Sequence, residues 1–180
     1  FVQAHLQGIV GGQHGHPGRQ RDAVFPCREL VKHGTEDLLD LAPAQSLAVG
    51  CKTGDAVFAV ETGDDLWAPV PPSSYHAMSG VHVIAHPAAE YEILMTDRYR
   101  SGRLRQQSAG TMTGYIHSSA GFGESTQDHV YAGSASIWEN GEVLAENERF
   151  STEPSLTVAD IDMEKLENLR KGMPGFNSSD

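Results

Sequence analysis

A pair of short apolar runs, at 56–61 (AVFAVE) and 81–86 (VHVIAH), constrains the fold more than any other feature of the sequence. Runs of this length that are apolar at almost every position are typical of strands covered on both faces. Between them, Ser73 or Ser74 can cap a short helix that continues to Met78. A strand, a helix and a strand with no hairpin turn between them predict a right-handed parallel crossover.

The remainder of the chain continues this mixture of strands and helices. Asn140-Gly141 predicts a tight hairpin, because both residues tolerate the positive φ angles that such a turn requires. Asp97 and Asp162 are placed to cap helices, and Gly172 to end the second one. The predicted elements are strands at 115–120, 134–138, 142–147 and 156–161 and helices at 98–113 and from 163 onward.

This pattern predicts an α/β fold with buried strands and helices on the outside. The 180 residues fit one domain, which we place at 1–176, with a loose tail at 177–180 at the end of the segment GFNSSD. The chain begins at Phe1 instead of Met, so we expect a piece of a longer protein or a trimmed product.

Composition excludes several function classes. The net charge of −11 argues against nucleic-acid binding, which needs a positive surface. No apolar run approaches the roughly 20 residues of a membrane span, and no signal peptide is visible. Only Cys27 and Cys51 are present, too few for a disulfide framework or a cysteine-based zinc site, so the expected location is a reducing cytoplasm.

Four arginines lie close together at Arg98, Arg100, Arg103 and Arg105. Because clustered charges usually lie on a solvated surface, we expect them on the side of a helix that faces solvent or another subunit.

The histidines do not predict a metal site. His14 and His16 form an isolated HxH pair, and His82 and His86 are spaced to lie on the same face of one strand. Neither pair has a cysteine partner or an HExxH spacing, so we expect no bound metal. No phosphate-binding loop is present either, since the sequence contains no GxxxxGK[ST] motif and no GxGxxG after a strand.

Several long motifs point to a known family. They are VETGDDLWAPVPPSSYHAMSG, VHVIAHPAAE, RLRQQSAGTMTGYIHSSAGFGESTQDHVYAGSASIWENGEVLAENERF and LTVADIDMEKLENLR. Over residues 57–169 the chain resembles the glutaminase domain of the glutamine-dependent NAD synthetases, which are members of the nitrilase (carbon–nitrogen hydrolase) superfamily. Before about residue 29 the match fades.

The resemblance implies a four-layer α-β-β-α sandwich that lacks its N-terminal strands and helices. The open sheet edges would then favour association, with a second copy of this chain or with a synthetase-type partner chain. The family's synthetase domain is absent, and with it the SGG-x-DS motif. We therefore expect no cofactor in this chain, because ATP would belong to the synthetase domain.

The resemblance also implies a catalytic Glu–Lys–Cys triad, whose cysteine attacks the carboxamide of glutamine and releases ammonia. Gly63 occupies the nucleophile position, and glycine has no atom that could form a thioester. The lysine would fall near Gln13 or His14, where the sequence has no lysine, and the glutamate would lie before Phe1. The resemblance therefore predicts an inactive site.

Two positions that contact glutamine in the family are altered as well. A serine is replaced by Glu90, and a basic residue by Thr96. Loss of one charge interaction at about 4 Å and a dielectric constant near 20 corresponds to roughly 4 kcal/mol. Both changes act against the binding of glutamine.

Three interpretations stay open on the sequence. The domain is an inactive glutaminase-like relic or a binding and regulatory partner, or it is an amidohydrolase that uses Cys27 or Cys51 as nucleophile. The third is an error in the sequence, because one base change converts Cys to Gly and a local frameshift would explain the unmatched residues 12–28. Reading the underlying DNA decides the third.

Overall fold

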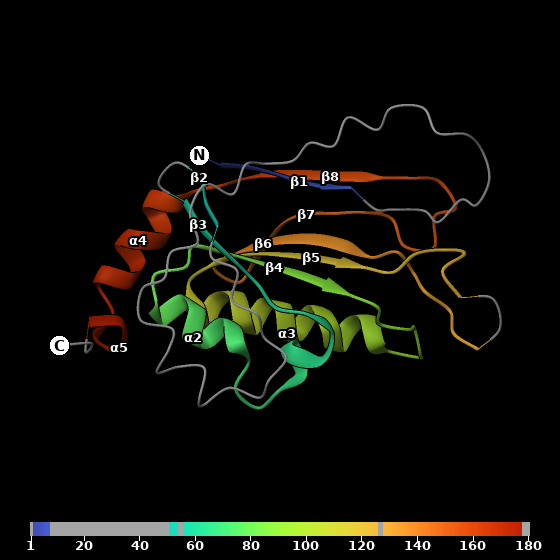
Figure 1. The fold of residues 1–180 in the computed structure, drawn as a ribbon, viewed down its shortest axis with the longest axis horizontal. Coiled ribbons are helices and arrows are strands. Elements are labelled where there is room, and N and C mark those ends of the chain that lie inside the picture. Colours follow the sequence, from blue (N-terminus) through green and yellow to red (C-terminus); the bar gives the residue numbers. More distant parts are fainter. Residues whose placement is uncertain (1, 8–50, 54–55, 126–127, 178–180) are drawn as a thin grey trace.

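The computed structural model describes residues 2–7, 51–53, 56–125 and 128–177. In Figure 1 these residues form three layers: helices α2 and α3 cover one face of a six-stranded sheet, and a two-stranded sheet lies against the other face. Within these ranges, no helix has the length and apolarity needed to cross a membrane. The α/β class predicted from the sequence is confirmed.

The larger sheet contains the predicted parallel core. Its strand order is β2-β3-β4-β5-β6-β7, in which β3, β4 and β5 are mutually parallel and the outer pairs antiparallel. The parallel arrangement predicted for the two apolar runs is confirmed, although the second strand begins at Val83 and not at Val81. The strands are β2 Cys51–Thr53, β3 Ala56–Val60, β4 Val83–Ala88, β5 Gly114–Ser119, β6 Ala135–Glu139 and β7 Glu142–Glu146.

The helical layer consists of the 3-10 helix η1 (Gly63–Trp67), α2 (Pro72–Met78) and α3 (Thr96–Thr111). The predicted caps of α2 and α3 are wrong. Pro71 precedes α2, so Ser73 and Ser74 lie inside the helix, where their hydroxyls accept hydrogen bonds from the Gln107 amide. Asp97 lies inside the first turn of α3, where its carboxylate pairs with arginines instead of capping the backbone.

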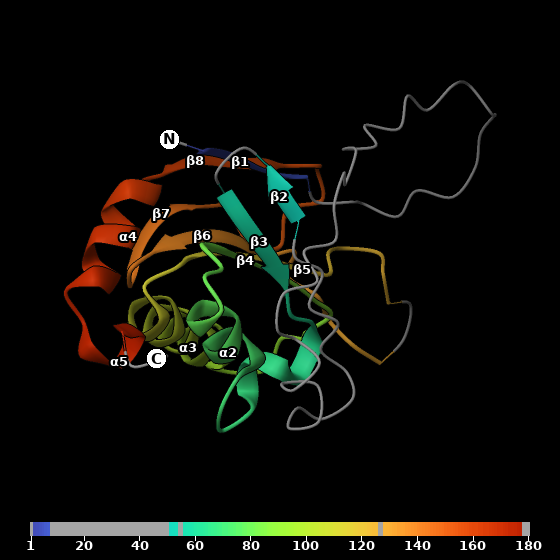
Figure 2. The same ribbon diagram turned by 60° about the vertical axis from the view of Figure 1, so that its left-hand side comes forward.

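The second sheet joins the two ends of the chain. Strand β1 (Val2–Gln7) pairs antiparallel with β8 (Leu156–Ile161), as Figure 2 shows at the top of the molecule. Helix α4 (Met163–Lys171) follows β8, and the predicted cap is confirmed because the Asp162 carboxylate accepts a hydrogen bond from the backbone N–H of Lys165 at 3.0 Å.

The chain then turns at Gly172 into α5 (Pro174–Asn177). Asn177, the first residue of the expected loose tail, ends α5, and residues 178–180 lie outside the described ranges.

Two apolar clusters hold the layers together. Between the larger sheet and the helices, the cluster is centred on Leu66, Leu104 and Tyr115. Between the two sheets and α4, buried residues such as Ile161 and Leu166 pack together. Since the carboxyl ends of β3, β4 and β5 point the same way, this packing presents the segments after these strands at one edge of the sheet.

The Asn140-Gly141 hairpin is confirmed between β6 and β7. Both residues have positive φ angles, 47° and 85°. Replacing Gly141 by alanine should lower the free energy of unfolding by about 1–3 kcal/mol, because the φ angle disfavours a side chain and the new Cβ would lie 2.8 Å from the Cβ of Ala109. Chemical denaturation measures this loss.

Gly102→Ala in α3 is the matched control for that prediction. An added Cβ there meets nothing within 4 Å, and alanine is favoured over glycine inside a helix by about 1 kcal/mol. The control should therefore be neutral or stabilising. Equal effects of the two substitutions would contradict the turn geometry.

Candidate functional site

The chain bends sharply after β3, at the position where the family resemblance expects the nucleophile. Gly63 has a φ angle of 55°, in the left-handed region, and begins η1. The Asp65 carboxylate accepts the backbone N–H of Thr62 at 2.9 Å and fixes the bend. A Cβ at position 63 would meet no atom of the described residues within 4 Å.

The structure describes the backbone of one of the two cysteines. Cys51 is in β2, and its backbone is opposite Phe58, five positions before Gly63 along the chain. Cys27 lies outside the described residues. Gly63 itself supplies no thiol at the bend, where the family resemblance places the nucleophile.

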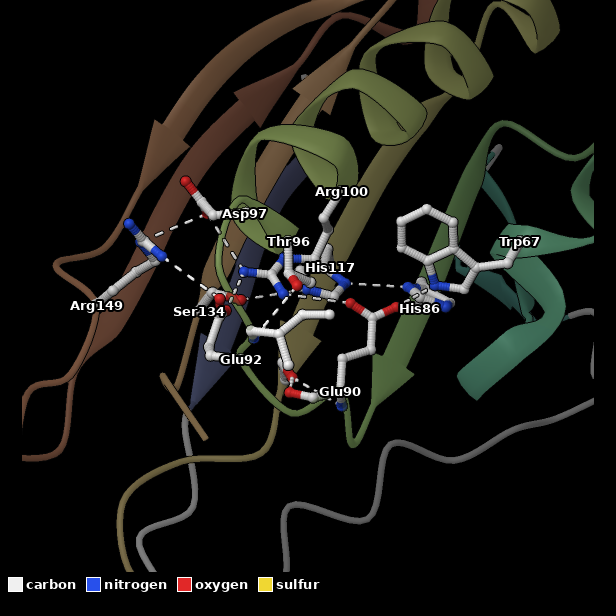
Figure 3. Close-up of polar contacts among 12 residues, drawn as sticks. Trp67, His86, Glu90, Glu92, Thr96, Asp97, Arg100, His117, Ser134 and Arg149 are labelled. Carbon is white, nitrogen blue, oxygen red and sulfur yellow. Dashed lines mark hydrogen bonds and ion pairs between the residues drawn. The ribbon is translucent and has the colours of Figure 1, made fainter. Parts of the chain in front are cut away.

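Glu90 follows β4 and lies beside the bend. One carboxylate oxygen accepts the indole N–H of Trp67 at 2.7 Å, and the other accepts from Arg100 at 3.3 Å (Figure 3). Thr96 begins α3, and its hydroxyl accepts the backbone N–H of Ile93 at 3.3 Å. The structure thus connects Glu90 to the bend through Trp67, whereas the Thr96 hydroxyl bonds within its own turn.

Arg100 is the centre of a buried ion-pair network, and its predicted position on a solvated surface is wrong. The residue is 2% exposed and donates to Glu90, Glu92 and Asp97. Arg149 reaches Glu92 at 3.6 Å and Asp97 at 3.4 Å. We refer to these five residues as the Arg100 network.

The network determines the charge state of its central group. Burial by itself lowers the pKa of Arg100, but the hydrogen bonds and charges of Glu92 and Glu90 outweigh burial, and the pKa is raised. Arg100 therefore always carries its positive charge. This charge balances the carboxylate of Glu90, which the sequence alone would leave without a partner.

The other arginines of the cluster differ in how far they are exposed, and Arg103 is half-buried. Arg103 donates to the backbone carbonyls of Leu66 and Ala68 and so ties α3 to the end of η1. Arg98 and Arg105 are exposed, as expected.

Two buried histidines connect the bend to the interior. His86 and His117 are opposite each other on β4 and β5, and their Nδ1 atoms are 3.0 Å apart. His86 Nε2 lies 3.0 Å from the carbonyl oxygen of Gly63, and His117 Nε2 lies 3.4 Å from the Ser134 hydroxyl.

The Gly63 carbonyl determines which ring nitrogen of His86 and of His117 carries the hydrogen. Because the Gly63 carbonyl can only accept, His86 must carry its hydrogen on Nε2 and accept on Nδ1. His117 then donates from Nδ1 and accepts from the Ser134 hydroxyl. Burial lowers the pKa of both histidines, so both rings are neutral, as this arrangement requires.

The structure separates His82 from His86. His82 accepts the backbone N–H of Val57 and contacts Glu167 of α4 at 3.2 Å, whereas His86 faces His117 and Gly63. In the described ranges, no group of three or more His, Cys, Asp or Glu side chains could hold a metal. His14 and His16 lie outside these ranges.

Glu61 precedes the bend and is 1% exposed. One of its carboxylate oxygens accepts the backbone N–H of Ser73 at 2.7 Å, and the other has no hydrogen-bond partner in the described structure. Burial raises the pKa of Glu61 to about 7. The bend is thus preceded by a carboxyl group that titrates near neutral pH.

Sequence reasoning missed Glu61, Arg100 and the histidine pair as parts of this site. The signal for Glu61 was an acidic residue directly after an apolar strand. For Arg100, the nearby acids at 90, 92 and 97 indicated a buried partner set.

Comparison with known proteins supports the family resemblance. Against family models the chain has no match. The solved glutamine-dependent NAD(+) synthetase of Cytophaga hutchinsonii aligns with a TM-score of 0.55 at 21% identity, over 63% of this chain and 18% of its own. Nit3 of Saccharomyces cerevisiae, a member of branch 10 of the nitrilase superfamily, aligns with a TM-score of 0.59 at 18% identity, over 72% of this chain and 45% of its own.

A curated relative shows the family of this chain. The glutamine-dependent NAD(+) synthetase of Mycobacterium leprae (strain TN) is 36% identical over 152 residues, or 82% of this chain and 22% of the relative. The chain is a homologue of the nitrilase-like domain of these synthetases. This nitrilase-like domain spans about a fifth of the length of the curated relatives that it matches.

Proposed function

We propose that this nitrilase-like domain has lost glutamine hydrolysis and serves as a non-catalytic scaffold. The observation that carries the proposal is glycine at position 63, at the left-handed bend after β3. A glutaminase of this superfamily needs a thiolate there, because the thioester forms on that atom. The domain keeps the backbone of the site and lacks the reacting group.

The polar surroundings of the bend support the same proposal. Glu90 uses both carboxylate oxygens on Trp67 and Arg100, so it has no free oxygen aimed at a substrate ammonium group. Thr96 brings no positive charge to the start of α3, and the substrate carboxylate therefore lacks its counterion. Chemistry with ATP, in this proposal, belongs to a separate synthetase domain.

The remaining role is binding to another protein. Apolar side chains are exposed on the outer strands, including Val143 (46%) and Leu144 (39%) on β7 and Leu156 (55%) on β8. Such surfaces favour association with a second copy of the chain or with a synthetase-type chain. Light scattering of the purified chain, and co-purification with a glutamine-dependent NAD(+) synthetase, test this role.

Ammonia release from glutamine tests the loss of activity. The wild-type chain should release none above background, and neither should Gly63→Cys, because the lysine and the glutamate of the triad are missing. A sensitive enzymatic assay for ammonia measures both, with glutamine and simple amides as substrates.

Cys27→Ala and Cys51→Ala distinguish the alternative. Turnover by the wild type that disappears in either variant would overturn the proposal and identify the recruited nucleophile. Turnover by Gly63→Cys alone would show instead that the chain supplies the two other triad groups from positions that the resemblance does not assign.

A further inference from the structure

A polar cavity of about 260 Å³ lies beneath the first turns of α3, away from the bend at Gly63. Helix α3 contributes Asp97, Arg100 and Ser101, and the sheet contributes Ser134 and Glu146 among others. Gly63, Glu90 and Thr96 are not among the lining residues. The cavity is therefore separate from the positions that the family resemblance assigns to glutamine.

The size of the cavity suits a small ligand. Pockets for drug-sized molecules begin at roughly 300 Å³, so a cavity of about 260 Å³ admits a molecule somewhat smaller than these. Three serine hydroxyls line it, from Ser101, Ser134 and Ser136. The Ser136 oxygen already accepts the indole N–H of Trp138, so its hydroxyl hydrogen can be donated to a ligand.

The charges around the cavity favour a cation. In the Arg100 network, the two guanidinium groups are already paired with the three carboxylates, of Glu90, Glu92 and Asp97. Glu146 adds a further carboxylate to the lining, and among the described residues it has no ion-pair partner. An anion would have to displace these acids from Arg149 or Arg100, whereas a cation finds Glu146 unpaired.

We propose that this cavity binds a small organic cation, an alkylammonium or guanidinium compound, with its charge on Glu146 and its polar groups on the serine hydroxyls. Ser134 and His117 are shared between the cavity lining and the hydrogen-bonded chain to Gly63. A ligand oxygen that accepts a hydrogen bond from the Ser134 hydroxyl therefore competes with His117 Nε2, and its binding is communicated through His86 to the carbonyl of the bend.

Calorimetry on the full 180-residue chain tests the proposal with n-butylamine and ethanolamine as cationic probes and butyrate as the matched anion. Saturable binding of the amines, and none of butyrate, is the expected result. Glu146→Gln should weaken amine binding about fivefold to tenfold, the effect of one partly solvated charge. Glu148→Gln, an exposed acid outside the cavity, should leave binding unchanged.

A second variant and a second readout keep the test decisive. Ser101→Leu, at a half-buried position of α3 that lines the cavity, should fill the cavity and abolish binding while the domain stays folded. NMR of the ring nitrogens should show that the amine shifts the His117 and His86 signals. Preference for butyrate, equal affinity of Glu146→Gln and wild type, or no saturable binding of either amine at millimolar concentrations would overturn the proposal.

Discussion

Replacing Arg100 by methionine should destabilise the domain by about 3–5 kcal/mol. The substitution leaves Glu90 buried without its cation and Glu92 with only the more distant Arg149, and the two side chains are only 10% and 8% exposed. Natural domains are stable by about 5–15 kcal/mol in total, so this loss is a large fraction of the total stability. Urea denaturation followed by circular dichroism measures the loss.

Two further variants separate charge from packing. Arg98→Met is the matched control, because Arg98 is exposed on the same helix and its loss should change stability by no more than about 0.5 kcal/mol. Adding Glu92→Gln to Arg100→Met should restore part of the stability, since it removes one of the uncompensated charges. A loss below about 1 kcal/mol for Arg100→Met would contradict the buried network.

The second large effect concerns Glu61 and pH. The pKa of this buried carboxyl is about 7 in the folded domain and 4.5 when exposed, so the folded state binds more protons between these values. Stability contributed by the protonated carboxyl is complete below pH 4.5 and is lost as the pH rises through about 7. The loss amounts to about 3 kcal/mol at pH 8 and above.

Glu61→Gln should remove this dependence. The glutamine oxygen can still accept the backbone N–H of Ser73, and the amide does not ionise. The difference in unfolding free energy between variant and wild type should therefore increase by about 3 kcal/mol in favour of the variant from pH 5 to pH 8. Taking the difference at each pH cancels the contribution of His86 and His117, whose lowered pKa values act in the opposite direction.

The exposed acid Glu148 provides the control for this experiment. Glu148→Gln removes the same charge from the surface, and its unfolding free energy should follow that of the wild type at every pH. A pH-independent difference between Glu61→Gln and wild type would mean that the Glu61 carboxyl is ionised normally in the folded domain.

Local signals predicted local structure well. The Asn140-Gly141 turn and the Asp162 cap depend on a few consecutive residues, and both are confirmed. Asp97 shows the limit of such signals, because its carboxylate is held by Arg100 and Arg149, and the second of these lies far along the chain. A capping residue is recognisable only when no distant group competes for it.

The site required information that the sequence pattern does not contain. The contact between His86 and His117 depends on the register of β4 against β5, and a shift of one residue would turn one ring to the other face of the sheet. Burial of Arg100 likewise depends on how α3 lies over the segment after β4. The family resemblance identified the bend at Gly63, whereas only the structure shows which charges surround it.

The pairing of β1 with β8 has a consequence for the order of folding. Val2 is opposite Ile161, so the second sheet cannot form until the segment up to residue 161 has left the ribosome. Contacts between such distant segments slow folding, because the loop between them must close first. Until β8 is made, the backbone of β1 lacks this partner, and unpaired strand edges of this kind favour aggregation during synthesis.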